Sequence, residues 1–514
     1  MTAKKRISPL RRAVAIGAIT SLLMVALPNV TVASSGSASA GTVVAYPNYK
    51  VAALLVTYPD NPTKPTRDDH AGVWTRDYLD QVLFTNAKSM AAYFAAESAG
   101  RVSVTGQVFD NGGQWYQVSR PVERNGRCDW TPYFRDVFAA ADADVDFSQF
   151  NSVMIFTPTI DCASGGTATS GYVPETNQWY GVTVMNSSLN TYPHHELGHL
   201  MRLGHANSWQ CDPPGILTGT NCKEYEYGDR YGIMGASSRM LSLPAPQREF
   251  LGWFSAGEEV EVASDGDYTI QNYETTSLVP KVLKIPKARD AAGNVTEWYY
   301  LEYRQPIGFD YVVNTPTIHE LGVPNGILVR MGFADASRNA ISTLLDMTPG
   351  STPSGLDIFK PALQLGSSYS DPVAGVSFGM LSRTAKATTI RVRFSAASLC
   401  QRNAPTATIK VMKGIAKPGQ EFRYDVTVKN PSILCGSLPM EFRPLKVPSG
   451  WSVTIDKQKK KTVNIVSGQT QKFVVRVTAP KKAKYQKYYI TLEARQAKQP
   501  TLKRAVVVKP VVKR

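Results

Sequence analysis

Cys-x-x-Cys pairs are absent from this sequence, although it contains 6 cysteines. Zinc-ribbon and thioredoxin-like sites therefore have no support. After residue 40 there is also no apolar run long enough to span a bilayer, so we expect no transmembrane segment in the mature chain. Hydrophobic residues make up 43% of the 514 residues and charged residues 19%, which excludes a disordered protein. A chain of this length should form roughly two to four domains.

Acidic residues are scarce in one part of the chain. Residues 401–514 carry 25 Lys and Arg but only 5 Asp and Glu, a balance of +20. Residues 41–400 carry 27 basic and 36 acidic residues, a balance of −9. Because solubility alone would not separate charge in this way, we expect residues 401–514 to bind an anionic surface or polymer, for example of a cell envelope. The alternative is a basic surface that only keeps the protein in solution. Nucleic acid is not an expected partner of an exported chain.

The N-terminus has the three parts of an export signal. Basic residues at positions 4, 5, 6, 11 and 12 precede an apolar run at positions 13–27, and small residues follow. Ala38-Ser39-Ala40 is one candidate cleavage site and Thr31-Val32-Ala33 is another. This order predicts a signal peptide over residues 1–40 and a secreted protein that is extracellular or associated with the cell envelope. An uncleaved membrane anchor is the alternative.

The cysteines form three neighbouring pairs along the sequence. An oxidising compartment outside the cell favours disulfides between them. Sequence alone does not fix their connectivity. We expect sequential pairing: Cys128–Cys162, Cys211–Cys222 and Cys400–Cys435. The last pair would join the two sides of a domain boundary near residue 400.

Strand and helix patterns change along the chain. Residues 42–58 have the apolar pattern of a buried strand, and residues 74–96 have the apolar spacing of one helix. We therefore expect an α/β or α+β domain over residues 41–257. Short strand patterns without a long helix predict a β-rich domain over residues 258–399 and a basic, immunoglobulin-like β-sandwich over residues 400–514. The expected fold class is a multidomain chain whose α/β (α+β) domain is followed by all-β sandwich domains.

Four of the 6 histidines lie within residues 190–208, NTYPHHELGHLMRLGHANS. Asn190, Thr191 and a proline at its start suit the N-terminus of a helix. His195 and His199 are four residues apart, so a helix places both on one face, where they can hold one Zn²⁺. A His-Glu-x-x-His pattern would occur by chance only ~0.002 times in a chain of this composition. The spacing therefore predicts a metal site.

Glu196 and His205 complete this candidate site. Glu196 follows the first ligand directly, so its carboxylate points beside the metal, where it can take a proton from zinc-activated water and pass it to the leaving amine. His205 follows His199 by six residues and offers a third nitrogen. Three protein ligands plus a water make a catalytic zinc site. An acid further along the chain, Glu224 or Glu226, is the alternative third ligand.

HELGHLMRLGH, residues 195–205, resembles the metzincin signature H-E-x-x-H-x-x-G-x-x-H. YGDRYGIMG, residues 227–235, resembles the Met-turn of that clan and contains Met234. SMAAYFAAESAGRVSVTGQVF lies before these motifs and APQREFLGWF lies after them. Together the segments are similar to the gametolysin family of secreted peptidases over roughly residues 45–255.

The resemblance implies a metzincin-like catalytic domain with one Zn²⁺ per chain and endopeptidase activity on an extracellular protein or peptide. Carried over by position, His195, His199 and His205 become the zinc ligands, Glu196 the catalytic base and Met234 the Met-turn methionine. Two other functions stay open. One is a surface-binding protein that has lost catalysis and acts through its β-sandwich domains, although a binder would not need the intact Glu196. The other is a metal-dependent hydrolase of non-protein substrates.

One position departs from the family pattern. The family has glycine where this chain has Arg202, at the point where the chain leaves the helix with a positive φ. Either Arg202 adopts the left-handed conformation at a cost of roughly 1–2 kcal/mol, or the helix runs two residues further and Gly204 makes the break.

Other candidate residues have weaker support. We expect His194 to be solvated in the first helical turn or to belong to the rim of a cleft, and His70 and His319 to lie at the surface. Three tyrosines in or just before the Met-turn motif could polarise a substrate carbonyl, but tyrosines in turns more often pack: Tyr225, Tyr227 and Tyr231.

Overall fold

The computed structural model describes residues 48–67, 72–163, 165–173, 177–186, 191–235, 239–276, 280–313, 322–334, 340–350 and 360–514. The expected signal peptide lies outside these residues, as do His70, Asn190 and His319. Within them, no helix combines the length and the apolar character needed to cross a membrane.

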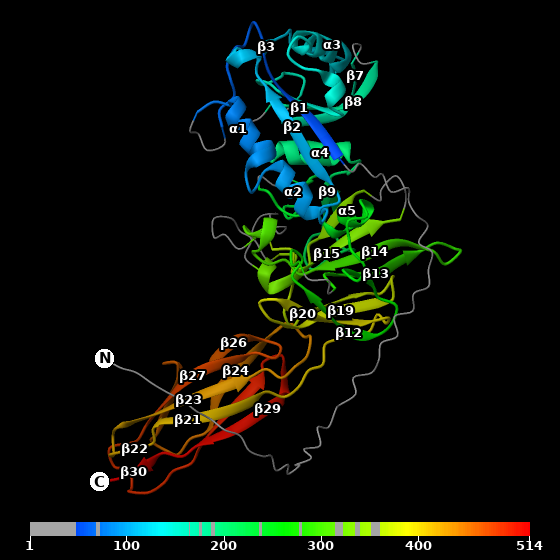
Figure 1. The fold of residues 1–514 in the computed structure, drawn as a ribbon. Helices are drawn as coiled ribbons and strands as arrows, with labels where there is room; N and C mark the ends of the chain where they lie inside the picture. Colours follow the sequence, from blue (N-terminus) through cyan, green and yellow to red (C-terminus); the bar gives the residue numbers. More distant parts are fainter. Residues whose placement is uncertain are drawn as a thin grey trace, which may run out of the picture. The chain divides into compact units, whose positions relative to one another are not determined.

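The first part of the chain contains a mostly parallel sheet (Figure 1). Its order is β2 (Ser103–Phe109), β1 (Asn48–Thr57), β6 (Ser152–Phe156), β8 (Gln178–Met185) and β7 (Gly166–Val173). The first four strands run parallel, and β7 runs antiparallel to β8 at the edge. The short β3 (Tyr116–Gln117) pairs with the end of β1, and β4 (Val122–Arg124) and β5 (Arg127–Asp129) form a separate hairpin.

Helices cover both faces of this sheet. Alternate residues of the central strand β1 point to opposite sides, and the side chains on both sides are apolar and need to be covered. Val51, Ala53 and Leu55 of β1 share one apolar core with α1 (Arg76–Asp80), α2 (Met90–Glu97) and α4 (Tyr192–Leu200). The alternate residues of β1 share a second core with α3 (Trp130–Ala141). The helix with the two-histidine motif is therefore held against the sheet by its apolar side.

The single helix expected over residues 74–96 is wrong. Helix α1 continues through a π-helical turn (Gln81–Thr85), and a separate α2 begins at Met90. Asn86 is extended, which ends the first helix. The side chain of Ser89 then accepts a hydrogen bond from the amide of Ala92 at 3.1 Å and caps the second. Two polar residues that favour caps outweigh the continuous apolar spacing.

A β-sandwich follows (Figure 1). Its larger sheet has the order β10 (Lys223–Tyr225), β9 (Ala206–Gln210), β16 (Ser342–Leu345), β15 (Gly326–Phe333), β14 (Val295–Glu302), β13 (Val282–Arg289) and β11 (Glu259–Glu261), with β17 (Leu363–Gln364) paired to β15. Its smaller sheet has the order β12 (Gly266–Gln271), β20 (Ala387–Arg393), β19 (Val376–Arg383) and β18 (Ser368–Asp371). Apolar side chains from both sheets form one core.

The expected boundary at residue 257 falls inside this larger sheet. Strands β9 and β10 precede the boundary, yet β9 pairs in parallel with β16, whose residues follow it. Strand β9 begins directly after His205. Helix α5 (Ala245–Phe250) lies between these strands in sequence and contacts β14, β15 and β16. The third histidine of the motif is thus joined to the sandwich and not only to the first sheet.

The last part of the chain is a second sandwich, as predicted (Figure 1). One sheet has the order β21 (Thr406–Lys413), β23 (Glu421–Lys429), β27 (Thr470–Thr478) and β25 (Ser452–Ile455). The other has the order β26 (Lys461–Val466), β24 (Ser437–Lys446), β28 (Ile490–Gln496) and β29 (Gln499–Val508). A short pair joins β22 (Ile415–Ala416) to β30 (Val511–Val512). Strand β24 contains two prolines, which interrupt its strand pattern in the sequence. The second, Pro444, lies at a bulge, where a strand tolerates the loss of an amide.

All three expected disulfides are present: Cys128–Cys162, Cys211–Cys222 and Cys400–Cys435. The first bridges β5 to the segment after β6, and the second closes the connection between β9 and β10. The third joins the segment before β21 to the segment before β24, at the start of the second sandwich. Sequential pairing is therefore confirmed.

Candidate metal centre

Helix α4 ends in a left-handed turn at Arg202. The residue has a φ of +69°, and Met201 before it is the C-cap. The amide of Arg202 donates to the carbonyl of His199 at 2.8 Å, and the amide of Leu203 donates to that of Gly198 at 3.0 Å. These two hydrogen bonds form a Schellman motif, which usually has glycine at the left-handed position. The chain therefore reverses at Arg202 in spite of its side chain.

Gly204 does not make the helix break, so the alternative with a longer helix is wrong. It has a different role, because a Cβ at this position would lie only 2.8 Å from Cγ1 of Ile341. Its amide also donates to the carbonyl of Ala340 at 3.1 Å. Glycine is needed here for a close approach of two segments, and that approach directs the following His205 towards α4.

Three imidazoles meet at the end of this helix. The Nε2 atom of His199 lies 3.1 Å from that of His195 and 3.1 Å from that of His205. One ring nitrogen from each histidine lies within 4.8 Å of the other two. Zn–N distances of about 2.0–2.1 Å in a tetrahedral site place ligand nitrogens about 3.3 Å apart. The spacing of the three rings therefore fits a single ion.

The outer nitrogen of each ring is fixed by an acceptor. Nδ1 of His195 lies 2.9 Å from the carbonyl of Ile233, and Nδ1 of His199 lies 2.8 Å from that of Leu203. Nδ1 of His205 lies 2.6 Å from a carboxylate oxygen of Glu226. Carbonyls and carboxylates only accept, so Nδ1 must be the donor in each bond, and in a neutral ring this leaves the lone pair on Nε2. This is the tautomer that a metal ligand needs.

The buried surroundings of these rings test whether a cation fits. Burial lowers the pKa of His195 to about 4, and the neighbouring His199 adds to the shift. Burial also lowers the pKa of His199. Both rings are then neutral at neutral pH, and their Nε2 lone pairs face each other with no proton between them. A metal ion relieves that repulsion, and nitrogen donors of this kind suit Zn²⁺.

Glu196 is buried beside the histidines, facing the edge strand β7. Only 3% of the residue is exposed, and burial raises its pKa to about 8. A Cβ at Gly166 of β7 would overlap with the carboxylate of Glu196, so glycine makes room for this side chain. A bound dication would oppose the effect of burial, because it favours the charged carboxylate. No pattern in the sequence marked Gly166.

Met234 lies beneath α4 in a tight turn, where the amide of Gly235 donates to the carbonyl of Gly232 at 3.0 Å. The methionine is fully buried, and a Cβ at Gly198 would lie 2.5 Å from its sulfur. The turn also holds the histidines through its backbone. Ile233 accepts from His195, and the carbonyl of Met234 accepts from the amide of Ala206 at 2.8 Å. The turn therefore supports both histidine segments.

A chain of buried charges joins this turn to the sandwich. The carboxylate of Asp229 accepts from the amide of Tyr231 at 2.7 Å and pairs with Arg330 of β15. Arg330 lies 3.1 Å from Glu302 of β14, which also pairs with Arg304 at 2.8 Å. All four charged side chains are fully buried. Losing one partner would leave others charged and buried, which costs about 3–5 kcal/mol.

The acids considered as alternative ligands lie elsewhere. Glu226 does not enter the group of metal-ligating atoms but hydrogen-bonds the outer nitrogen of His205. Glu224 of β10 accepts a hydrogen bond from the hydroxyl of Thr343 at 2.7 Å. Among the described residues, the only group of three that could hold a metal is His195, His199 and His205.

The expectation for His194 is wrong. The ring is fully buried and packs edge-on against Tyr93 of α2, with 5.3 Å between the ring centroids. It lies one position before His195, on the side of α4 that faces the core. Of the three tyrosines, Tyr231 is buried in a core and Tyr225 is half-exposed on β10. Tyr227 lies with its ring centroid 3.7 Å from that of His205, so it alone of the three stacks on the histidine cluster.

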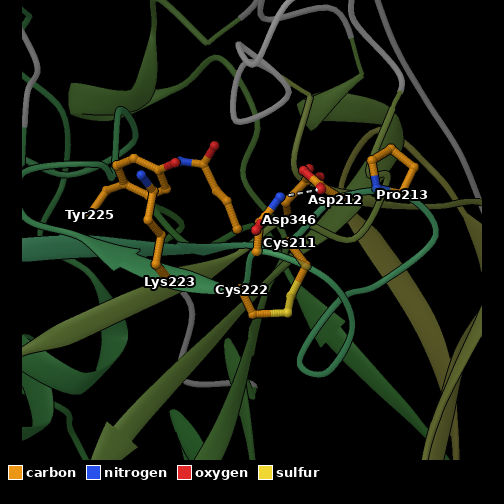
Figure 2. Close-up of a pocket in the computed structure, with 9 residues that line it drawn as sticks. Cys211, Asp212, Pro213, Cys222, Lys223, Tyr225 and Asp346 are labelled. Atoms are coloured by element: carbon orange, nitrogen blue, oxygen red, sulfur yellow. Dashed lines mark hydrogen bonds between the residues drawn. A yellow bond between two sulfur atoms is a disulfide. The ribbon is translucent and has the colours of Figure 1, made fainter.

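A cavity of about 500 Å³ lies at the other end of β9 and β10 (Figure 2). The Cys211–Cys222 disulfide lies on its wall, and Lys223 and Tyr225 project from β10 beside it. Asn221 donates to the carboxylate of Asp212 at 2.7 Å on the same wall. The three histidines are not among the residues that line this cavity. It is therefore distinct from the candidate metal centre.

Comparison with known families gives one match. Residues 416–496 match the family described as "NPCBM-associated, NEW3 domain of alpha-galactosidase". The match spans the second sandwich from β22 to β28 and does not cover the histidine motif, so the resemblance to gametolysin stays a prediction. No curated protein matches the chain.

Solved structures give only partial likenesses. A CARDB domain from Pyrococcus furiosus is 16% identical over 22% of this chain and 90% of its own, with a TM-score of 0.17. The sporulation control protein Spo0M from Bacillus subtilis is 15% identical over 22% of this chain and 50% of its own, with a TM-score of 0.15. The secreted serine protease VesC from Vibrio cholerae is 10% identical over 25% of this chain and 28% of its own, also with a TM-score of 0.15. Likenesses of this size carry no argument about function.

Proposed function

We propose that this chain is a secreted zinc-dependent endopeptidase of metzincin type. One observation carries the proposal. Three imidazole Nε2 atoms converge, the outer nitrogen of each ring is held by an acceptor, and a buried carboxylate lies in the same helix. His195, His199 and His205 would hold the ion, and Glu196 is then the group free to move a proton. Packing alone gives no reason to gather these groups.

Zinc bound there would supply Lewis-acid chemistry, polarising the scissile carbonyl and acidifying a water. The protein supplies the proton transfer. Glu196 takes a proton from the attacking water and returns it to the leaving amine. Its buried position keeps it from bulk water, and Gly166 leaves it space to face the site. Tyr227, stacked on His205, would stabilise negative charge that develops on the substrate oxygen.

The edge strand β7 supports a peptide substrate over a non-protein one. It pairs with β8 on one side, and in the described part of the chain no strand pairs with its other side. The strand also packs against α4 and passes the Glu196 carboxylate at Gly166. An extended peptide can add to such an edge through main-chain hydrogen bonds. That would place a peptide bond beside the histidine cluster.

The match to the NEW3 family favours a second candidate, a surface-binding protein that acts through its sandwiches. Intact Glu196 argues against loss of catalysis. Profiling of new protein N-termini, with the wild type and Glu196→Gln added to the same secreted proteins, distinguishes a peptidase from a surface-binding protein. If the chain is a peptidase, new N-termini should appear with the wild type alone. Equal profiles would favour the binding protein or a hydrolase of non-protein substrates.

A further inference from the structure

One end of the second sandwich gathers loops and the last strand, and we call it the basic end: residues 411–419, 445–450, 480–489 and 507–514. Backbone hydrogen bonds hold these segments together. The amide of Gly419 donates to Pro480 at 3.2 Å, and that of Tyr488 donates to Pro510 at 2.8 Å. Trp451, which directly follows the segment 445–450, packs on Tyr488 with 4.5 Å between the ring centroids. The basic end is thus one surface and not a set of separate loops.

This surface carries an unusual density of positive charge. Its exposed cations include four lysines of one loop and the last two residues of the chain: Lys481, Lys482, Lys484, Lys487, Lys513 and Arg514. The acids of residues 401–514, all of which the structure describes, are engaged elsewhere. Glu421, Asp425, Glu441 and Glu493 pair with cations outside the basic end. Asp456 accepts from the amide of Val474. In the described part of the chain, none of the six cations named above pairs with a carboxylate, so their charge is available to a partner.

The same surface also exposes large apolar side chains. Val411, Ile415, Tyr485 and Tyr489 are 61%, 55%, 59% and 60% exposed, and Met412, Leu445, Val447 and Val507 are exposed as well. The tyrosines lie among the cations, with Arg514 5.8 Å from the ring centroid of Tyr485 and Lys509 6.0 Å from that of Tyr489. Single exposed apolar residues are ordinary, but a group of them on one surface marks an interaction site.

We propose that the basic end binds the surface of an anionic lipid bilayer. Lysines attract anionic headgroups while their apolar stems lie along the interface. Tyrosines suit the boundary between headgroups and acyl chains. Val411, Ile415 and their apolar neighbours contribute binding free energy only if they are transferred out of water. A bilayer interface allows this transfer, whereas a hydrated polyanion does not. This separates a lipid surface from an envelope polymer, although both would satisfy the lysines.

Co-sedimentation of the full-length chain with vesicles tests this proposal, and it does not depend on peptidase activity. Binding should be strong to phosphatidylglycerol vesicles, absent on phosphatidylcholine vesicles, and weaker at high salt. A variant with Lys481→Gln, Lys482→Gln, Lys484→Gln and Lys487→Gln should bind at least about a hundredfold more weakly, since each lysine near an anionic surface contributes about fivefold. The matched control changes four exposed lysines away from the basic end: Lys457→Gln, Lys459→Gln, Lys498→Gln and Lys503→Gln. This control should lose less than about tenfold in vesicle binding, because its lower net charge weakens the general attraction to the anionic surface but leaves the basic end intact.

An apolar variant distinguishes the two kinds of anionic partner. Ile415→Ser, Tyr485→Ser and Tyr489→Ser together keep every charge, and their exposed positions leave the fold intact, which the melting temperature checks. This variant should lose at least about tenfold in vesicle binding and nothing in binding to soluble polyphosphate. Equal loss in the two lysine variants would overturn the proposal. So would unchanged vesicle binding by the apolar variant, or tighter binding of the wild type to polyphosphate than to vesicles.

Discussion

Gly166 of strand β7 lies so close to the carboxylate of Glu196 that any side chain at position 166 would occupy the space that the carboxylate fills. A Cβ built on Gly166 would overlap with the carboxylate oxygen, the δ-carbon and the γ-carbon of Glu196. Glu196 is also almost fully buried and cannot move aside into solvent. The edge strand and the motif helix are therefore matched to each other at this contact, and the position of the proposed base depends on it.

Gly166→Ala should displace Glu196 without touching the histidines. We expect about a 10²-fold loss of kcat/KM on a peptide substrate, since a misplacement of about 1 Å has that effect on a reacting group. Zinc content should stay at one per chain. Thr169→Ala on the same strand is the control and should keep nearly full activity. A fully active Gly166→Ala enzyme would show that Glu196 is not positioned by this contact.

Zinc retention should separate the three residues considered as third ligand. His205→Ala removes a nitrogen from the cluster and should abolish stable binding. Glu226→Gln keeps His205 as a ligand but weakens the acceptor of its Nδ1 hydrogen bond. The affinity for zinc should therefore fall by about 10–100-fold. Glu224→Ala, on the neighbouring strand but bonded to Thr343, should bind zinc like the wild type. The zinc content of each variant is measured after dialysis against a chelator. If Glu224 were the third ligand, Glu224→Ala would lose zinc and His205→Ala would retain it.

Arg202→Gly should stabilise the protein. Arg202 pays for a left-handed conformation that glycine adopts freely, and its side chain is exposed. We expect a gain of about 1 kcal/mol in the free energy of unfolding. Arg202→Ala is the control and should give no gain, because alanine has the same Cβ. Equal melting temperatures for Arg202→Gly and Arg202→Ala would refute the strain at this position.

Residues 258–399 should be needed for the metal centre, whereas residues 400–514 should not. The strand after His205 pairs with β16, and Asp229 before the Met234 turn pairs with Arg330. A chain ending at residue 257 loses both partners and should fail to retain zinc. A chain ending at residue 399 keeps them and should retain one zinc. Equal zinc content in the two shortened chains would contradict the role of the first sandwich.

Local patterns predicted much of the candidate site and of the second sandwich. His195 and His199 share a face because the helical period places them there, and strands such as β23 and β27 follow from alternation in the sequence. The disulfides followed the order of the cysteines. The helix and strand patterns depend on neighbours in sequence, and each disulfide joins two consecutive cysteines of the chain, which is why these features could be predicted.

Long-range pairings were not accessible in this way. The pairing of β9 with β16 joins segments more than a hundred residues apart, and Asp229 and Arg330 carry no sign of their contact in the sequence. His194 is polar, yet the direction of α4 buries it against Tyr93. The break before Ser89 did leave a signal, since Asn86 and Ser89 favour caps, but the apolar spacing outweighed it in the prediction.

Cleavage of casein by the wild type and by Glu196→Gln, each purified with one zinc per chain, tests the assignment of Glu196 as the base of a zinc peptidase. Glutamine keeps the size of the side chain and removes the proton acceptor. This assignment predicts hydrolysis by the wild type and a rate at least ~10²-fold lower for the variant, with the zinc content unchanged. A zinc-loaded wild type that cleaves no peptide bond, or a variant that cleaves as fast as the wild type, would contradict it.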